Sequence, residues 1–489
     1  MGAKLSDFRM PLADRGPALI GLRRFALLAV FVFFYCAVLY WVYVNRVLRF
    51  EYLGYTYEEP HLGYLIVSAV ALALLAFMLP QRIERPSTFV LWLLFALVIV
   101  PGAQISLYSG YVSPEKGLLA ALVLISGLGI VRLITMRKRV PALLAFVLPS
   151  RIFWIAVAVF SAGVYVVIGV AMGSELRLVG LSGVYELRDS YKAALASSGS
   201  ILGYLVGTQA NVVNPLLVIR GITSRNYGIA ALGLLGQVLI FSATGFRTVL
   251  FSVPAIIAVS IIFLLRSRPR MSGFSDRPIT FGFGGRPRAS IFVWAPALVM
   301  VVSVLVDLAT NSIVWTSLFG RRFIVTPGLM TGIYAEYYSE NPPALLAHSV
   351  LPWLDTPYEF APARTIGFWV TGSSDVSMNA HLFADGFANF GLAGVIGAAA
   401  VLGIYLRMTD RASVGLPPAV PSLLLLMLTI TLSNTSILTA MFSHGLVAAF
   451  LVLVFAPRDG WEPVPGRRSV RQFIAEAGKR SKRPSAADA

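Results

Sequence analysis

Long apolar stretches separated by short polar ones dominate the chain between residues 25 and 455. A helix needs about 20 apolar residues to cross the hydrocarbon core of a bilayer. The pattern therefore predicts an all-α polytopic membrane protein with about 12 transmembrane helices. We place these helices at residues 25–44, 62–79, 89–107, 118–135, 152–171, 199–219, 227–242, 249–265, 291–308, 390–406, 418–432 and 438–455.

Two of the predicted helices are weaker than the others. The stretch 227–242 is short, and the stretch 199–219 contains Gln209, Asn211, Asn214 and Pro215. Non-helical backbone is tolerated at membrane depth only where protein or a water-filled cavity covers it. Either segment could therefore be a full span or a broken, re-entrant one.

The charge of the chain has two possible meanings. The formal net charge of +17 alone would suggest a nucleic-acid partner. However, only 13% of residues are charged, 57% are hydrophobic, and the mean hydropathy is +0.77. These values favour a membrane protein with basic cytoplasmic loops.

Sorting the charges by side decides between these meanings. With 12 spans, the N-terminal arm, the even-numbered loops and the C-terminal tail share one side, with 30 Lys+Arg and 9 Asp+Glu. The opposite side has 10 Lys+Arg and 14 Asp+Glu. The positive-inside rule then places both termini in the cytoplasm. The net charge of +17 therefore reports the topology of the chain. It does not indicate nucleic-acid binding, and we expect no nucleic-acid partner.

This topology divides the chain into five parts. Residues 1–24 form a basic cytoplasmic arm, 25–308 the first nine helices with short loops, and 309–389 a large extracytoplasmic loop. Residues 390–456 form the last three helices, and 457–489 a basic cytoplasmic tail. A loop of about 80 residues is too long to be a mere connector, so we expect chemistry there.

Several kinds of site are not supported by the sequence. The single cysteine, Cys36, lies in an apolar run, which indicates a core thiol and excludes an intramolecular disulfide. No His-x-His, His-Glu-x-x-His or outer Asp-x-Asp occurs, and no Gly-x-Ser-x-Gly. We therefore expect neither a metal nor a cofactor.

Arginines on the acidic outer face run against the positive-inside bias. Arg188 lies in the middle outer loop, Arg247 in a very short turn between two short helices, and Arg321 and Arg322 in the long loop. One interpretation is ion pairing with an outer acid such as Glu336, or snorkelling to lipid phosphate. The other is a site for a diphosphate, which guanidinium groups recognise in a bidentate manner.

The segment 378–391 brings a carboxylate, a histidine and two amides to the outer membrane surface. Asp385 could remove a proton from an acceptor hydroxyl, or it could cap the start of the tenth helix. His381 is more simply explained as a hydrogen-bonded side chain than as a base. Aromatic residues of the long loop could stack on sugar rings, or they could pack the loop and the interfacial belt: Phe319, Tyr334, Tyr337, Tyr338, Trp353, Tyr358, Phe360, Phe368 and Trp369.

Short motifs in the second half of the chain occur in an order that resembles a known family. They are the segments 184–188 (VYELR), 214–216 (NPL), 244–248 (TGFRT), 321–323 (RRF) with Pro327-Gly328, 337–342 (YYSENP), and Asn379 followed by 385–391 (DGFANFG). In this order they resemble the bacterial oligosaccharide repeat-unit polymerases, the Wzy-type O-antigen and exopolysaccharide polymerase family. The resemblance covers roughly residues 180–455.

The resemblance implies a GT-C-like, metal-independent glycosyltransferase in the bacterial cytoplasmic (inner) membrane. Such an enzyme moves a growing glycan from undecaprenyl diphosphate onto the next lipid-linked oligosaccharide repeat at the outer face. Its partners would be undecaprenyl-diphosphate-linked oligosaccharides and membrane lipids, together with chain-length regulator and flippase proteins. The alternatives are another lipid-linked-sugar glycosyltransferase or ligase, and a polysaccharide flippase or transporter.

The resemblance also implies roles for individual residues. Arg247, Arg321 and Arg322 would hold the diphosphate, and Arg188 would make a further phosphate or supporting contact. Asp385 would be the catalytic base on the acceptor hydroxyl. The remaining substrate-binding residues would be Asn379, His381 and Asn389. The family often has Lys where Arg247 stands, which supplies the charge without the bidentate fork.

Overall fold

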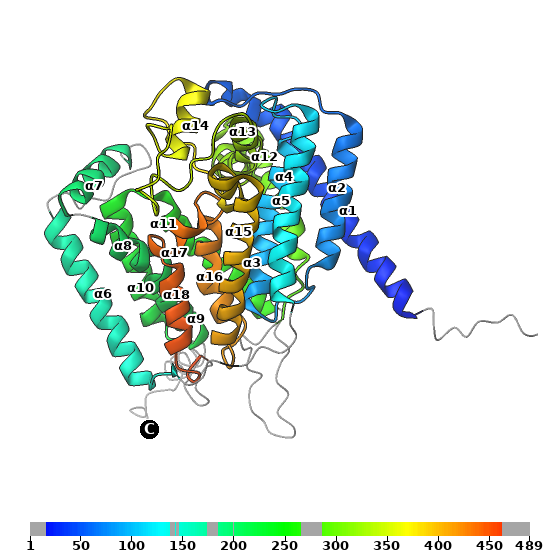
Figure 1. Ribbon diagram of the computed structural model, residues 1–489. Helices are drawn as coiled ribbons and strands as arrows, with labels where there is room; N and C mark the ends of the chain where they lie inside the picture. The colour runs from blue at the N-terminus through cyan, green and yellow to red at the C-terminus, as the bar shows by residue number, and fades with distance from the viewer. Residues whose placement is uncertain are drawn as a thin grey trace, which may run out of the picture.

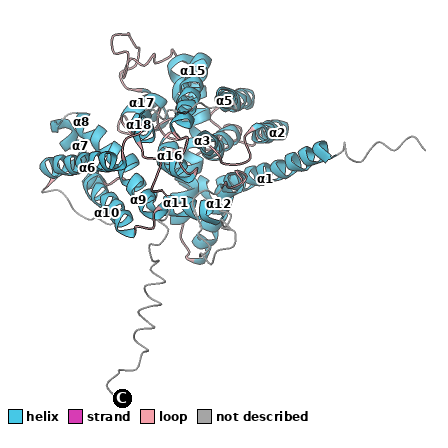
Figure 2. Ribbon diagram, turned by 90° about the horizontal axis from the view of Figure 1, so that it is seen from below, coloured by secondary structure: helices cyan, strands magenta, loops and turns pink. Residues whose placement is uncertain are grey.

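The computed structural model describes residues 16–136, 142, 146–173, 184–198, 200–265 and 286–461. These residues form an all-helical bundle whose long helices run between two ends (Figure 1). Figure 2 views the bundle along these helices from below. Within the described residues, β pairing is limited to an isolated bridge between Arg82 and Arg288.

The helices follow the chain in order, with π-helical and 3-10 segments marked η. The first half contains α1 (Gly16–Arg46), η1 (Val47–Leu53), α2 (Leu62–Met78), α3 (Pro86–Leu94), η2 (Phe95–Ile99), α4 (Val100–Ile105), α5 (Pro114–Thr135), α6 (Ser150–Met172), α7 (Val184–Ser198), α8 (Ser200–Thr208), η4 (Gln209–Val213), α9 (Asn214–Thr223) and α10 (Tyr227–Thr244). The second half contains α11 (Arg247–Leu265), α12 (Ile291–Ala309), η5 (Thr316–Val325), α13 (Thr326–Glu340), α14 (Pro362–Thr371), α15 (Leu382–Ala412), α16 (Ala419–Thr431), α17 (Ile437–Phe442) and α18 (Leu446–Phe455).

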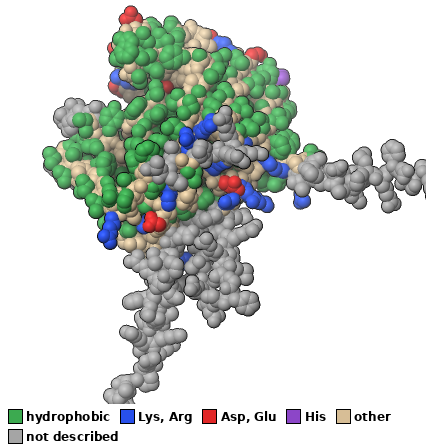
Figure 3. All heavy atoms as spheres, turned by 60° about the horizontal axis from the view of Figure 1, so that its bottom comes forward, with side chains coloured by type: hydrophobic (Ala, Val, Ile, Leu, Met, Phe, Trp, Pro, Cys, Tyr) green, Lys and Arg blue, Asp and Glu red, His purple; other side chains and the backbone are tan. Residues whose placement is uncertain are grey.

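The apolar helices confirm that this is a multi-pass membrane protein. Among the described residues, nine helices are long and apolar enough to cross a membrane, and α2, α16 and α18 are shorter apolar helices. Together they coincide with the 12 predicted stretches. In Figure 3 hydrophobic side chains cover the flank of the bundle, and Lys and Arg gather toward its lower end. The number of crossings and the orientation stay predictions.

The two weak stretches both form helices. α8, η4 and α9 run on from one another over residues 200–223, with a π-helical segment at Gln209–Val213. The polar side chains bond across helices: Gln209 Nε2 donates to Ser161 Oγ at 2.8 Å and to Asn214 Oδ1 at 2.7 Å. Asn214 Nδ2 in turn donates to Gln237 Oε1 at 3.3 Å. Polar partners on α6 and α10 thus satisfy groups that would be costly in hydrocarbon.

Loops that we predict to share a side meet at the same end of the bundle. The backbone N–H of Ile83 donates to Pro287 O at 3.1 Å, which joins the second and eighth loops. At the other end, the backbone N–H of Glu58 donates to Tyr108 O at 3.1 Å, which joins the first and third loops. The described loops therefore alternate between two ends, as the charge argument requires.

Some segments in the charge argument lie outside the described residues. They are the N-terminal arm before residue 16, residues 137–141 and 143–145 of the fourth loop, residues 266–285 of the eighth loop, and the tail from residue 462. Arg177 of the middle outer loop lies outside them as well.

The last predicted helix, 438–455, is broken in the structure. α17 ends at Phe442 and α18 begins at Leu446, with Gly445 between them at φ 96°. A side chain on Gly207 of α8 would collide with the carbonyl oxygen of Ser443. Ser443 and His444 lie at this break, but the average hydropathy over 438–455 does not register it because the rest of the stretch is apolar.

The long predicted loop, 309–389, is largely helical and packs against the bundle. η5 and α13 run continuously over residues 316–340 and pack on α4 and α5. A Cβ on Gly328 would lie 2.7 Å from the Pro101 backbone carbon, so the two helices approach to backbone contact there. α14 lies above this layer, at the outer end of the molecule (Figure 1).

α15 consists of two helices joined by a sharp turn. Phe390 and Gly391 have non-helical dihedrals, and Gly391 has φ 58° and ψ −140°. The turn brings Gly386 and Gly394 into backbone contact, since a Cβ on Gly386 would lie 2.6 Å from Gly394 O. The short first part, residues 382–389, is therefore folded against the long second part.

Candidate functional site

The site is built from the outer end of the bundle, and its first part is η5. Asp307, at the end of α12, is 1% exposed and accepts three hydrogen bonds from the start of η5. Ser312 Oγ donates to Oδ1 at 2.7 Å, Trp315 N to Oδ1 at 2.9 Å, and Thr316 N to Oδ2 at 2.8 Å. A carboxylate that accepts the first N–H groups of a helix fixes where that helix begins.

Arg321 lies half-buried on η5 among a hydroxyl and two rings. Its Nη2 donates to Ser317 Oγ at 2.9 Å. Its guanidinium lies 4.5 Å from the centroid of Phe50 and 5.8 Å from that of Tyr55. Ring faces attract the cation but do not neutralise it. Among the described residues, no ion pair joins Arg321 to a carboxylate.

Arg322 is exposed and lies on the part of η5 that packs on α11. Phe251 of α11 contacts Phe319 and Phe323 of η5, with ring centroids 5.8 Å and 6.2 Å apart. α11 begins at Arg247, four residues before Phe251. The side chain of Arg247 lies outside the described part of the structure, but its helix start and η5 belong to one packed unit.

Arg188 of α7 joins the same region from a third element. Its Nε donates to the carbonyl of Gly245 at 3.3 Å, and its guanidinium lies 5.9 Å from the Phe246 ring. We use the name arginine region for Arg188, the 244–247 turn, Arg321 and Arg322. The structure thus gathers the elements that carry the four predicted phosphate-binding arginines.

Arg364 does not join the arginine region. Its Nε donates to Ser374 O at 3.0 Å, and its guanidinium stacks 4.5 Å from the Phe360 ring within its own loop. Glu336, which we considered as a partner for an outer arginine, pairs with Lys116 at 3.2 Å.

His381 caps the first helix of α15. Its Nδ1 accepts a hydrogen bond from Ala384 N at 3.2 Å, so the proton of the neutral ring lies on Nε2, which donates to Thr331 Oγ1 at 2.9 Å. Complete burial lowers the pKa of His381 to about 3. As placed, neither ring nitrogen is free for a substrate.

The two asparagines differ in their surroundings. Asn389 is 3% exposed and uses both ends of its amide: Nδ2 donates to Asp385 O at 2.9 Å, and Oδ1 accepts from Leu346 N at 2.8 Å. This ties α15 to a segment in which Leu345 and Leu346 adopt φ near +55°. Asn379 is exposed and accepts a hydrogen bond from Ser377 Oγ at 3.3 Å.

Asp385 is a half-buried residue in the first turn of α15. Since His381 is the N-cap, the alternative role of Asp385 as the cap does not apply. Burial, together with Tyr358, Tyr337 and the charge of Asp385, raises the pKa of the Tyr338 phenol. The Tyr338 hydroxyl is buried and has no hydrogen-bond partner among the described residues. The Tyr338 hydroxyl is thus an unsatisfied polar group on which the charge of Asp385 acts.

Several residues in this arrangement escape prediction from the sequence. Phe50, Tyr55 and Ser317 surround Arg321, and Thr331 holds His381. These partners lie up to about 270 positions away along the chain, so periodicity could not connect them. The one available signal is the density of aromatic residues in the segments 50–57 and 334–338.

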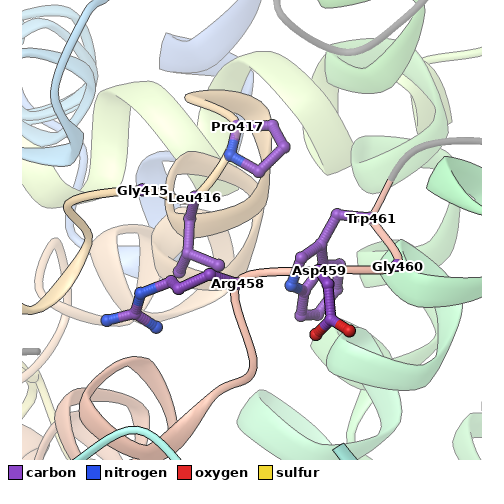
Figure 4. Close-up of a pocket in the computed structure, with 7 residues that line it drawn as sticks. All are labelled: Gly415, Leu416, Pro417, Arg458, Asp459, Gly460 and Trp461. Atoms are coloured by element: carbon purple, nitrogen blue, oxygen red, sulfur yellow. The ribbon is translucent and has the colours of Figure 1, made fainter.

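A separate cavity lies at the opposite end of the bundle (Figure 4). It has a volume of about 390 Å³ and is lined by Gly415–Pro417 and by Arg458–Trp461. Arg458 donates to Ala412 O at 2.7 Å and to Leu453 O at 3.1 Å, which caps the C-terminal ends of α15 and α18. This arginine therefore holds two helix ends together, far along the bundle from the arginine region.

Within the described residues, no group of three or more His, Cys, Asp or Glu side chains could hold a metal ion. No family model, curated protein or solved structure matches the chain. The resemblance to the repeat-unit polymerases stays a prediction that rests on the sequence motifs.

Proposed function

We propose that this protein is a polysaccharide polymerase of the outer face of the bacterial cytoplasmic membrane. It transfers a growing glycan from undecaprenyl diphosphate onto a lipid-linked oligosaccharide repeat. The observation that carries this proposal is the arginine region: arginine-bearing elements from three separate loops meet at one end of the bundle, the end whose loops are acidic overall.

The arginine region suits a lipid diphosphate. Arg321 is held by Ser317 and by ring faces, so its charge is positioned without being neutralised by a carboxylate among the described residues. Arg322 adds an exposed cation on the same helix. Positioned cations stabilise the charge that develops on a departing diphosphate.

The transfer also requires a base for the acceptor hydroxyl, and Asp385 supplies it. The oxygen of an acceptor hydroxyl attacks the anomeric carbon of the donor glycan, a new glycosidic C–O bond forms, and the C–O bond to the diphosphate breaks. The diphosphate departs with the bonding electron pair, and the Asp385 carboxylate accepts the hydroxyl proton. His381 and Asn389 orient the helix that carries Asp385, so we assign them positioning roles.

The test of function is mass analysis of lipid-linked glycans in a strain that lacks the gene. We expect single repeats to accumulate and polymer to disappear, because the donor and acceptor of a polymerase are both lipid-linked repeats. Accumulation of long lipid-linked chains would indicate a ligase instead. A loss of outward-facing repeats, with repeats retained on the inner face, would indicate a flippase.

The test of the site is replacement of single arginines. We expect Arg321→Ala and Arg322→Ala to lower polymer formation in membranes by at least about 100-fold, since removal of one donor from a charge-stabilising site costs this much in other enzymes. Arg364→Ala is the matched control, because Arg364 is an outer arginine of the same loop outside the arginine region. Full-length polymer from both Arg321→Ala and Arg322→Ala would rule out the diphosphate site.

A further inference from the structure

Aromatic side chains of α13, α14 and two neighbouring loops contact one another in series, next to the Tyr338 phenol on which the charge of Asp385 acts. The ring of Tyr337 on α13 lies 5.4 Å from Trp369 on α14, 6.2 Å from Tyr358 and 5.0 Å from Tyr338. Tyr111, before α5, lies 6.4 Å from Trp369. We use the name aromatic platform for Tyr111, Tyr337, Tyr358 and Trp369.

The platform is held rigidly but remains open to solvent. α14 turns Thr365, Ile366 and Gly367 inward, and Gly367 lies in backbone contact with Val376. The opposite side exposes Trp369, with 45% of its surface accessible. A large ring fixed on one side and open on the other can bind a flat apolar surface without a large loss of conformational entropy.

The inner end of the platform adds a polar group. Tyr338 contacts Tyr337 and Tyr358, and its buried hydroxyl has no partner among the described residues. Apolar ring faces next to an unsatisfied polar atom match the two surfaces of a sugar, which has C–H groups on its ring faces and hydroxyls at its edges.

Position and charge argue against a lipid as the occupant. α14 lies above α13, at the outer end of the molecule (Figure 1). Around the platform the exposed acids Glu340, Asp355, Glu359 and Asp375 outnumber the bases Lys116 and Arg364, and Lys116 pairs with Glu340. A net acidic surface disfavours contact with an anionic membrane surface.

We propose that the aromatic platform binds the sugar rings of a glycan chain and leads them to Asp385. This inference rests on the proposed function, since it identifies the subsite that would hold the acceptor glycan. The sugar nearest Asp385 would lie against Tyr338, and a sugar farther along the chain would stack on Trp369.

The test is binding of free oligosaccharides, which carry no diphosphate, to the full-length protein in lipid nanodiscs. The probes are oligosaccharides obtained by partial acid hydrolysis of the surface polysaccharide of the source cells. Saturation-transfer NMR reports which sugars touch the protein, and a titration gives Kd. We expect Trp369→Ala to raise Kd about tenfold, as loss of one aromatic stacking contact does, and Trp369→Phe to retain most of the affinity.

Trp353→Ala is the matched control. Trp353 lies in the same loop and is 73% exposed, and no ring contact to it occurs among the described residues. We expect the Kd of the Trp353→Ala variant for the oligosaccharides to stay within about twofold of the wild-type value. If wild type binds none of the oligosaccharides, or if Trp369→Ala and Trp353→Ala behave alike, the platform is not a glycan site.

Three further outcomes separate a glycan site at the platform from its alternatives. The chain has eight tryptophans, some of them in apolar helices, so the informative quantity is a difference. Brominated lipids that quench less of the fluorescence of Trp369→Ala than of wild type would place Trp369 in the bilayer and overturn the inference. If single lipid-linked repeats accumulate in the deletion strain while Trp369→Ala binds sugar normally, the platform is not a glycan site and the proposed function stands. If no repeats accumulate but Trp369→Ala binds sugar weakly, the platform stands and the polymerase assignment fails.

Discussion

His381 shows how a single side chain can serve the fold at a place where chemistry is expected. Its two ring nitrogens connect the start of α15 with Thr331 on α13, and both bonds require the neutral ring. Protonation would turn Nδ1 from an acceptor into a donor and would set it against the N–H of Ala384. The helix that carries Asp385 is therefore held by a group that must stay uncharged.

This requirement makes the stability of the protein depend on pH. Burial lowers the pKa of His381 from 6.5 to about 3. Between these values the unfolded chain binds a proton that the folded chain does not, so stability falls as the pH drops below 6.5. We expect the midpoint of thermal unfolding in detergent to fall between pH 7 and pH 4.5, and His381→Asn to make this decline shallower.

The control for this experiment is His348→Asn. His348 is exposed and bonds only the carbonyl of Tyr358 among the described residues, so its replacement should leave the pH dependence unchanged. An unfolding midpoint that falls equally in wild type and His381→Asn would show that other groups cause the decline.

At the scale of the element, irregular helices build the site. η5 carries Arg321 and Arg322 in a π-helical segment, and α15 turns sharply at Phe390 and Gly391. π-helical segments are often found at functional sites because the extra residue redirects side chains. The turn in α15 places Asp385 on a short helix beside α13 instead of on the axis of the long helix.

The turn in α15 predicts an unequal effect of two alanine substitutions. A Cβ on Gly394 would collide with the carbonyl oxygen of Gly386, whereas a Cβ on Gly397, one turn later, meets nothing within 4 Å. We expect Gly394→Ala to lower the unfolding midpoint and to reduce polymer formation strongly, because the Asp385 helix must move. Gly397→Ala should be neutral or stabilising by up to about 1 kcal/mol.

The measurement compares thermal unfolding and polymer formation of both variants in the same membranes. Equal activity of Gly394→Ala and wild type would mean that the short helix is not held against the long one. A loss of activity in Gly397→Ala would show that alanine at this helix has effects unrelated to the turn.

The apolar helices can be located from the sequence, whereas the turns and breaks within them cannot. The apolar stretches coincide with helices because hydropathy reports directly which residues tolerate a lipid environment. The turn at Gly391 depends on the local contact of Gly386 with Gly394, and the break before Gly445 on a contact between distant segments, that of Gly207 with Ser443. Hydropathy is insensitive to them, although the glycines at 386, 391 and 394 were visible.

The same limit applies to the candidate site. The outer arginines could be selected from the sequence because they oppose the charge bias of the chain, and the structure gathers the elements of four of them. The roles of His381 and Asn389 could not be predicted from the sequence, since a histidine or an amide looks the same whether its partner is a substrate or the protein. Thr331 and Leu346, which occupy these side chains, became known only from the fold.

At the scale of the whole molecule, the bundle contains two hydrophobic cores. The main core includes residues from α1 to α5 and from α11 to α18, together with part of α9. A smaller one gathers Val164, Leu202, Ile240 and their neighbours from α6, α7, α8, η4, α10 and the start of α11. The arginine region includes elements of both cores, because Arg188 belongs to the helices of the smaller core and η5 to those of the larger one.

The orientation of the whole molecule in the membrane is the assumption on which the proposed function depends. The charge bias predicts that the end with Arg82 faces the cytoplasm and that the end with Asp355 faces outward. Both residues are exposed, and the natural Cys36 is buried, so a single introduced cysteine can be labelled with little background. We expect a membrane-impermeant maleimide to label Asp355→Cys in intact spheroplasts and Arg82→Cys only after lysis. The reverse labelling order would place the arginine region in the cytoplasm. In the proposed scheme lipid-linked repeats are assembled there but not polymerised. The polymerase assignment would then fail, even if the arginine variants had lost activity.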